Sequence, residues 1–127
     1  MFLKPFLCWM SNELKNRTKL FVLRVIQHVR KISFSDLNSI LVKQLLRSVT
    51  STGANYRSAL RGKSTADFIA KLSIAEEEAD ESCYWLEILI ESGISKNPET
   101  EILLSEARQI AAILTASCKT AKSKLNK

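Results

Sequence analysis

Residues 68–90 read FIAKLSIAEEEADESCYWLEILI, and this stretch decides the fold class. Its apolar residues recur at intervals of three and four, which is the spacing of one face of an α-helix. The residues of that face are Phe68, Leu72, Ala75, Ala79, Cys83, Leu86 and Ile90. The pattern predicts a long helix with one buried side, and Gly93 is expected to end it.

Three other stretches of the chain show the same apolar spacing. The first follows Asn12, which is expected to cap a helix that continues to residue 32. The second covers residues 36–61 and begins after Ser35 or at Asp36 itself. The last follows Asn97-Pro98-Glu99, a helix start signal with a capping Asn and a Pro at the first helical position.

The ambiguous part is SVTSTGAN, residues 48–55, because these residue types are mediocre helix formers. Leu45, Thr52 and Tyr56 nevertheless keep helical spacing across it, so we predict one continuous helix. Its small side chains would allow a neighbouring helix to approach closely. Four amphipathic helices joined by short loops predict an all-α protein, an antiparallel up-down-up-down four-helix bundle.

The chain divides into three parts on this interpretation. Residues 1–11 form an N-terminal extension outside the fold, residues 12–121 form the bundle domain, and residues 122–127 form a basic tail. The last nine residues, KTAKSKLNK, are expected to fray into solvent. The capping-box pattern at Ser64-Thr-Ala-Asp67 marks the start of the third helix, after Gly62 has ended the second.

Targeting and cysteine usage point to a cytoplasmic protein without a membrane partner. The apolar opening, residues 1–10, contains Lys4 and Pro5 and is far shorter than the roughly 20 residues that cross a bilayer. The three cysteines are an odd number and form no CxxC pair, which is typical of a reducing compartment.

The charge of the chain is divided into three blocks. Residues 1–63 hold twelve Lys or Arg and two acids, a net charge of +10. Residues 64–107 hold two Lys and eleven acids, a net charge of −9, and residues 108–127 hold five Lys or Arg and no acid. The blocks could neutralise each other within or between subunits, or the positive excess could bind an anionic partner such as RNA. On the second interpretation the phosphate contacts are Arg17, Lys19, Arg24, Arg30, Lys31, Lys119, Lys122 and Lys124.

Residues 76–81, EEEADE, are the densest charge cluster. We expect a structural ion-pair network with arginines of the second helix, although a partner surface or a metal site would also use such carboxylates. The network would consist of Arg47, Arg57, Arg61, Glu76, Glu77, Glu78, Asp80 and Glu81. The adjoining Tyr84-Trp85 pair is expected at a helix or subunit boundary.

His28 is the only histidine of the chain, which excludes several kinds of site. A di-iron centre needs two Glu-x-x-His motifs, and a zinc site needs several nitrogen or thiolate ligands. Ser-His-Asp catalysis would depend on His28, which we expect at the surface or at a helix boundary. We therefore predict no catalytic residue, no metal and no cofactor.

Four short motifs carry a family resemblance, and they are QLLRS (44–48), GANYR (53–57), ADFI-x-KL (66–72) and EEEAD-x3-YWLE (76–87). With them, residues 12–119 resemble the bacterial four-helix bundle family that includes proteins encoded in intervening sequences of 23S ribosomal RNA genes. The resemblance implies an antiparallel bundle, a helical 48–55 stretch and a ring-like homopentamer. Val49, Thr52 and the Gly62-Lys63 pair depart from the family's usual residues.

The same family is similar in fold to the accessory protein of diversity-generating retroelements, a basic pentameric bundle that engages nucleic acid and a reverse transcriptase. By this analogy the leading hypothesis is a non-enzymatic homopentamer that binds RNA or ribonucleoprotein. The alternative is a protein-interaction adaptor, or an accessory subunit of a nucleic-acid enzyme such as a reverse transcriptase.

Overall fold

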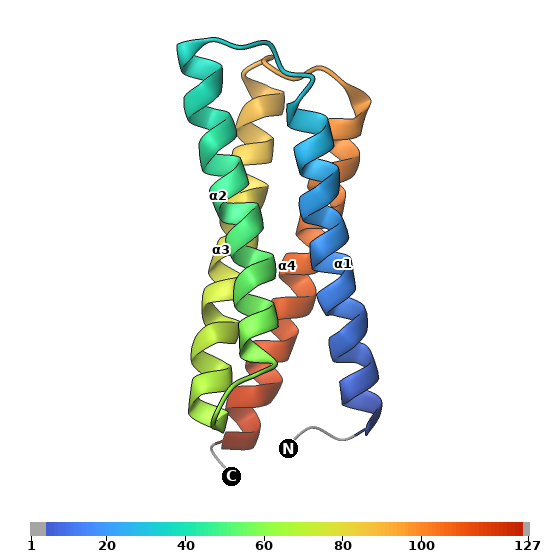
Figure 1. Cartoon of the computed structure of the whole chain (residues 1–127), viewed down its shortest axis with the longest axis vertical. Helices are drawn as coiled ribbons and strands as arrows, with labels where there is room; N and C mark the ends of the chain where they lie inside the picture. The colour runs from blue at the N-terminus through green and yellow to red at the C-terminus, as the bar shows by residue number, and fades with distance from the viewer. Residues whose placement is uncertain (1–4, 126–127) are drawn as a thin grey trace.

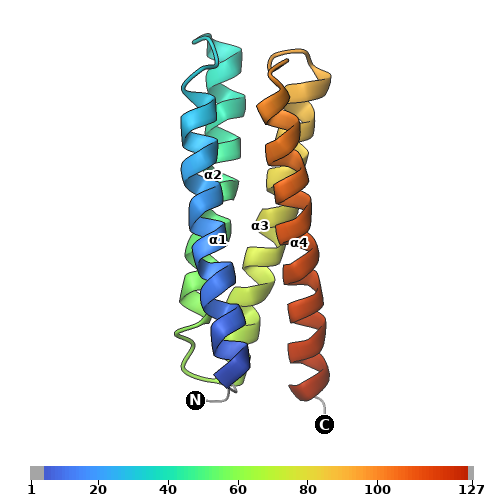
Figure 2. The same ribbon diagram turned by 90° about the vertical axis from the view of Figure 1, so that its right-hand side faces the viewer.

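The chain forms an antiparallel four-helix bundle, as the apolar spacing predicts. The computed structural model describes residues 5–125, and the side chains of residues 12–125. Its helices are α1 (Pro5–Val29), α2 (Asp36–Ala59), α3 (Thr65–Glu91) and α4 (Pro98–Leu125). Figure 1 shows α2 beside α3 and α1 beside α4, and Figure 2 shows α1 beside α2 and α3 beside α4, so each helix has two neighbours. Consequently α1 begins and α4 ends at the same end of the bundle as the α2–α3 turn.

The predicted apolar stripes line the core. On α3 the stripe residues Leu72, Ala75, Ala79 and Leu86 are buried, with Cys83 beside them. The fully buried large aliphatic side chains come from all four helices, and each contributes roughly 1.5–3 kcal/mol through removal of its surface from water. They include Val25, Leu45, Val49, Leu72, Leu86, Leu89, Leu103 and Leu114.

Residues 48–55 are helical, so the periodicity predicted this stretch correctly where propensity did not. Gly53 shows how closely α1 approaches α2 along this stretch. A Cβ atom at this position would lie 3.6 Å from Val22 Cγ2 and 3.8 Å from the Thr18 carbonyl oxygen of α1. These are ordinary van der Waals distances, so α1 packs closely enough on α2 that a side chain as small as alanine would just fit.

The helix starts follow the predicted capping residues in three cases. Ser35 Oγ accepts a hydrogen bond from the Asn38 N–H, and Ser64 Oγ accepts one from the Asp67 N–H. Asn97 Oδ1 accepts from the Glu99 N–H at 2.9 Å. Asp67 accepts from the Lys63 N–H at 3.1 Å, one residue before the position that a standard capping box uses.

Two predicted boundaries are wrong. Asn12 does not cap α1, because the helix begins at Pro5, a residue type whose fixed φ and missing N–H suit the first helical position. The C-terminal tail does not fray from Lys119, because α4 continues to Leu125. There Cys118 is still buried, and Lys122 and Lys124 interact favourably with the helix dipole. The packing of residues 1–11, predicted to lie outside the fold, falls outside the described side chains.

Both glycines at helix ends stop their helices for different reasons. Gly93 has φ +79°, a left-handed conformation that disfavours other residues, directly after α3. At Gly62 a Cβ would lie 3.0 Å from the Ala59 carbonyl oxygen and 3.1 Å from the Phe68 nitrogen. Gly62 is thus required by the close approach of the α2–α3 turn to the first turn of α3.

Candidate nucleic-acid interface

Arg17 is one of the basic residues predicted to contact phosphate, but its guanidinium is engaged by α4. Its Nε donates to Glu106 Oε2 at 2.8 Å, and its Nη2 donates to Glu106 Oε1 at 2.7 Å and to Gln109 Oε1 at 2.9 Å. The bond from Arg17 lowers the pKa of the Glu106 carboxyl, and the same bond raises the pKa of Arg17. This two-point contact removes Arg17 from the side chains that are available to a phosphate.

Arg24 lies two helical turns after Arg17 on α1, and it also pairs with an acidic residue of α4. Its Nη2 lies 3.0 Å from Glu99 Oε1 of α4. The acidic first half of α4 thus neutralises part of the basic surface of α1. In this region, oppositely charged parts of the chain neutralise each other within one subunit, which is the first of the two interpretations of the charge blocks.

The other predicted phosphate contacts of α1 and of the turn that follows it are exposed. Lys19, Arg30 and Lys31 make no ion pair with any residue in the described range 12–125. Arg30 donates a long hydrogen bond of 3.4 Å to Gln27 Oε1. These three cations remain free to meet an anionic partner.

The predicted tail lysines lie with other cations at one end of the bundle. The last two turns of α4, the end of α2 and the α2–α3 turn all lie at this end (Figures 1 and 2), where the start of α3 separates α2 from α4. We call this surface the basic end, and its exposed residues are Arg57, Arg61, Lys63, Lys119, Lys122 and Lys124.

Few acids oppose the basic end. Of the described acidic residues, Glu13 and Asp67 lie nearby in α1 and α3, and Glu76 of α3 lies beside Cys118, which directly precedes Lys119. The Asp67 carboxylate is already bound by the Lys63 N–H and by Lys71 Nζ at 3.2 Å, and these bonds lower its pKa. None of the six cations of the basic end makes an ion pair with a residue in the range 12–125, so these neighbouring acids offset their charge only in part.

The ion-pair network predicted for residues 76–81 is smaller than expected. Arg47 is paired with both Glu78, at 2.7 Å, and Glu81. No ion pair involving Glu76, Glu77 or Asp80 is found among residues 12–125.

Helix register explains why the other two arginines do not join this network. The Ser48 and Ser82 hydroxyls are 3.1 Å apart, which places the middle of α2 against the middle of α3. Because the helices are antiparallel, Arg57 lies roughly 15 Å from Arg47 toward the start of α3. Arg57 and Arg61 belong to the basic end instead.

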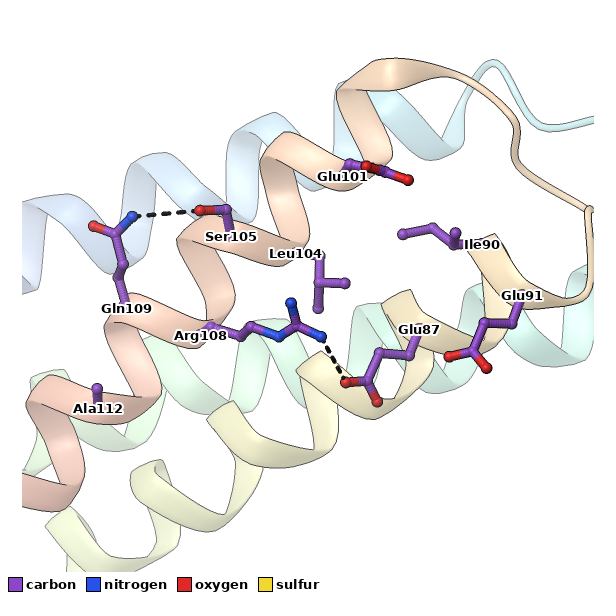
Figure 3. A pocket seen from close by; sticks show the side chains of 9 residues that line it. All are labelled: Glu87, Ile90, Glu91, Glu101, Leu104, Ser105, Arg108, Gln109 and Ala112. Atoms are coloured by element: carbon purple, nitrogen blue, oxygen red, sulfur yellow. Dashed lines mark hydrogen bonds and ion pairs between the residues drawn. The ribbon is translucent and has the colours of Figure 1, made fainter.

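An open depression of about 470 Å³ lies between α3 and α4. Figure 3 shows Glu87 and Glu91 of α3 facing Glu101 and Arg108 of α4 across it. Arg108 Nη2 is 3.1 Å from Glu87 Oε1. The depression contains none of the carboxylates of residues 76–81, and no group of three metal-ligating side chains is found in the described part of the chain.

Sequence reasoning placed His28 wrongly, because His28 is 2% exposed. Its Nε2 lies 2.6 Å from Thr100 Oγ1 and 3.3 Å from Ser95 Oγ, and the two hydroxyl oxygens are 2.5 Å apart. The apolar stripe of α1 includes this position, since His28 follows Val25 by three residues. That spacing was the available signal for burial.

The Tyr84 and Trp85 rings meet edge to face, with centroids 5.0 Å apart. Tyr84 is exposed, while Trp85 is partly buried and packs against the core. Both lie on α3 next to acidic residues, far along the helix from the basic end. This location does not provide the basic surroundings of a base-stacking platform.

No helix within the described residues is long and apolar enough to cross a membrane. None of the curated proteins compared with the chain matches it. A solved structure does match, that of a protein with unknown function from the S23 ribosomal protein family of Bacteroides thetaiotaomicron. The two sequences are 35% identical, the alignment covers 86% of this chain and 97% of the other, and the TM-score is 0.78.

The sequence pattern of the 23S rRNA-intervening sequence protein family matches residues 10–116. These residues include all four motifs that carry the resemblance, and the bundle has the architecture that the resemblance implies. The chain therefore belongs to the 23S rRNA-intervening sequence protein family.

Proposed function

We propose that this protein is a non-enzymatic, homo-oligomeric bundle that binds RNA or ribonucleoprotein through its basic end. The observation that carries the proposal is the group of six exposed Lys and Arg side chains at that end, contributed by α2, α4 and the α2–α3 turn. Such side chains bind phosphates and position a protein on RNA without reading its bases. The name of the family, which refers to ribosomal RNA, is consistent with this partner class.

The non-enzymatic part of the proposal is supported by how the reactive groups are used. The imidazole of His28 is buried against two hydroxyl groups, away from solvent. Two carboxylates of residues 76–81 meet Arg47, and the buried thiol of Cys83 has a pKa raised to about 11, mainly by desolvation. A thiol with such a pKa is protonated near neutrality and is a poor nucleophile.

Self-association, with the homopentamer that the family resemblance implies, is supported by the number of large apolar side chains on the surface. Phe34, in the turn before α2, is 87% exposed, and Leu37 and Ile40 of α2 are each 60% exposed. Contiguous apolar surface on a small domain marks contact with another macromolecule.

The free buried thiols of Cys83 and Cys118 agree with a reduced cytoplasmic location.

Filter binding to a structured RNA at 50 and 200 mM salt tests the RNA proposal. Binding must weaken steeply with salt, because each neutralised phosphate releases counterions. The double variant Lys122→Ala/Lys124→Ala should weaken binding and reduce the salt slope by about two. Lys43→Ala/Lys96→Ala is the matched control, because it removes the same charge from exposed positions outside the basic end.

A third variant, Arg30→Ala/Lys31→Ala, distinguishes the basic end from the exposed cations of α1. Equal losses for both double variants would mean that RNA contacts both regions. Absence of binding at 50 mM salt, or binding that does not respond to salt, would refute the proposal.

A further inference from the structure

We propose that copies of this chain assemble by a heterologous contact, in which the α1/α4 face of one copy docks on the α2/α3 face of the next. The inference rests on the proposed self-association and names the two surfaces that would meet. The faces lie on opposite sides of the bundle (Figures 1 and 2). Each carries exposed apolar side chains and a distinct charge.

The α1/α4 face has an apolar centre with an ion pair on either side. Leu20 lies between Arg17 and Arg24 on one stripe of α1, and Ile102 lies between Glu99 and Glu106 on one stripe of α4. The Arg17–Glu106 and Arg24–Glu99 pairs set the antiparallel register, which places Leu20 opposite Ile102. Both remain more than half exposed, at 56% and 53%.

Leu23, 51% exposed, extends this apolar centre along α1. Three large aliphatic side chains grouped inside a polar border differ from apolar residues scattered singly on a surface. An apolar centre with a polar rim is the usual anatomy of a protein–protein interface.

The α2/α3 face is located by Arg47, which reaches from α2 to Glu78 and Glu81 of α3. Leu37 and Ile40 continue the Arg47 stripe toward the start of α2, because they precede it at helical spacing. Trp85 follows Glu81 by four residues on the corresponding stripe of α3. Its ring is partly buried against the core and partly exposed, and Trp is enriched at the energetic centres of interfaces.

The charges of the two faces are complementary. Arg47 and the exposed Lys43 four residues before it are the cations of this face, and Glu77, Glu78 and Glu81 give its α3 side a net negative charge. On the other side of the bundle, Lys19 of α1 and Arg30 and Lys31 of the turn after it are exposed and have no described acidic partners. Attraction between a basic and an acidic face favours a second copy in this orientation and opposes contact between like faces.

The contact also leaves the basic end open. Ile102 is in the second turn of α4, and Leu37 and Ile40 are in the first two turns of α2. Both helices start at the end of the bundle that is opposite the basic end (Figure 1). When two different faces bind each other, the copies form a closed ring if the repeated rotation from copy to copy brings the last copy back to the first. A ring with an odd number of copies requires a contact of this kind. In a ring of this kind every basic end points to the same side.

The test uses one variant per face, Leu20→Glu for the α1/α4 face and Ile40→Glu for the α2/α3 face. Both positions are more than half exposed, so the fold is expected to tolerate the change, and far-UV circular dichroism checks it. Sedimentation velocity should show an oligomer for the wild type and a monomer for each variant. Leu125→Glu, at a position that is 53% exposed near the end of α4, is the matched control and should remain oligomeric.

Mixing the two variants is the decisive step. Each still has one intact face, so a 1:1 mixture should form a dimer that grows no further. A contact between identical faces would instead leave one of the two variants associated on its own, because that variant keeps the only surface the contact uses. If Leu20→Glu or Ile40→Glu unfolds, Ile102→Glu or Leu37→Glu replaces it on the same face.

The outcomes separate this inference from the proposed function. A monomeric wild type at tens of micromolar would refute self-association and this inference together. An oligomeric wild type whose face variants stay oligomeric, or whose mixture forms no dimer, would refute the named faces and leave self-association intact. RNA binding by the basic end is measured independently of all three results.

Discussion

The imidazole of His28 in α1 is hydrogen-bonded to the hydroxyl of Thr100 in the first turn of α4, with Nε2 and Oγ1 2.6 Å apart. Ser95 completes the cluster from the α3–α4 turn. His28 Nδ1 is buried without a partner in the described chain. Because an unpaired N–H costs more than an unpaired lone pair in such a place, the favoured neutral tautomer carries its proton on Nε2 and donates to Thr100.

This arrangement makes stability depend on pH. Burial lowers the pKa of His28 below its ordinary value, and nearby Lys31 lowers it further, while Glu99 acts in the opposite direction. The unfolded chain therefore binds the proton more readily than the folded chain. Stability should be complete above about pH 6.5 and should decline as the pH falls below that value.

Urea unfolding at pH 7.5 and pH 5.5 measures this dependence, since most carboxyl groups titrate below that interval. In His28→Gln the difference in unfolding free energy between the two pH values should largely disappear. A wild type that is equally stable at both pH values would contradict the expectation.

Removal of the Thr100 hydroxyl should destabilise the bundle without changing its volume. Thr100→Val leaves His28 Nε2 and Ser95 Oγ with fewer partners in a buried place, at a cost of about 1–3 kcal/mol. Thr115→Val is the matched control, because Thr115 is an exposed residue of the same helix. Chemical unfolding of both variants checks the prediction, and equal stabilities would refute it.

The two glycines that meet neighbouring backbone should respond in opposite ways to alanine. A Cβ at Gly53 has van der Waals room at 3.6 Å from Val22, so Gly53→Ala should stabilise α2 by up to about 1 kcal/mol. A Cβ at Gly62 would be crowded by the Ala59 carbonyl and the Phe68 backbone, so Gly62→Ala should lower the melting temperature. Differential scanning calorimetry of the two variants compares the signs.

Arg17 should contribute to stability and not to RNA affinity. Its contact with Glu106 is bidentate but partly exposed, so Arg17→Ala should cost about 0.5–1 kcal/mol of unfolding free energy. Because the guanidinium is already engaged, the salt slope of RNA binding should stay that of the wild type. A slope reduced as much as in Lys122→Ala/Lys124→Ala would show that Arg17 reaches phosphate.

Several features of the site could not be predicted from sequence because they depend on which helix surfaces oppose each other. Arg17 and Arg57 both sit on basic amphipathic helices, and composition alone does not distinguish them. Arg17 pairs with Glu106 of α4, whereas Arg57 makes no ion pair with an acidic residue of the described chain. For His28, the apolar spacing indicated burial. The two hydroxyl groups near its Nε2 belong to Ser95 and Thr100, which are 67 and 72 residues away in the sequence, so no local pattern could have identified them.

The sequence by itself determined the four helices, their caps at Ser35, Ser64 and Asn97, and the continuity of residues 48–55, because helical periodicity and capping are local properties of the chain. Only the tertiary structure decided which cations are neutralised. Antiparallel register sets Arg17 and Arg24 against α4 and leaves the cations of α2 and α4 together at one end. The physical reason is that a carboxylate must lie within a few ångströms to neutralise a guanidinium, and that distance is set by helix packing rather than by spacing along the chain.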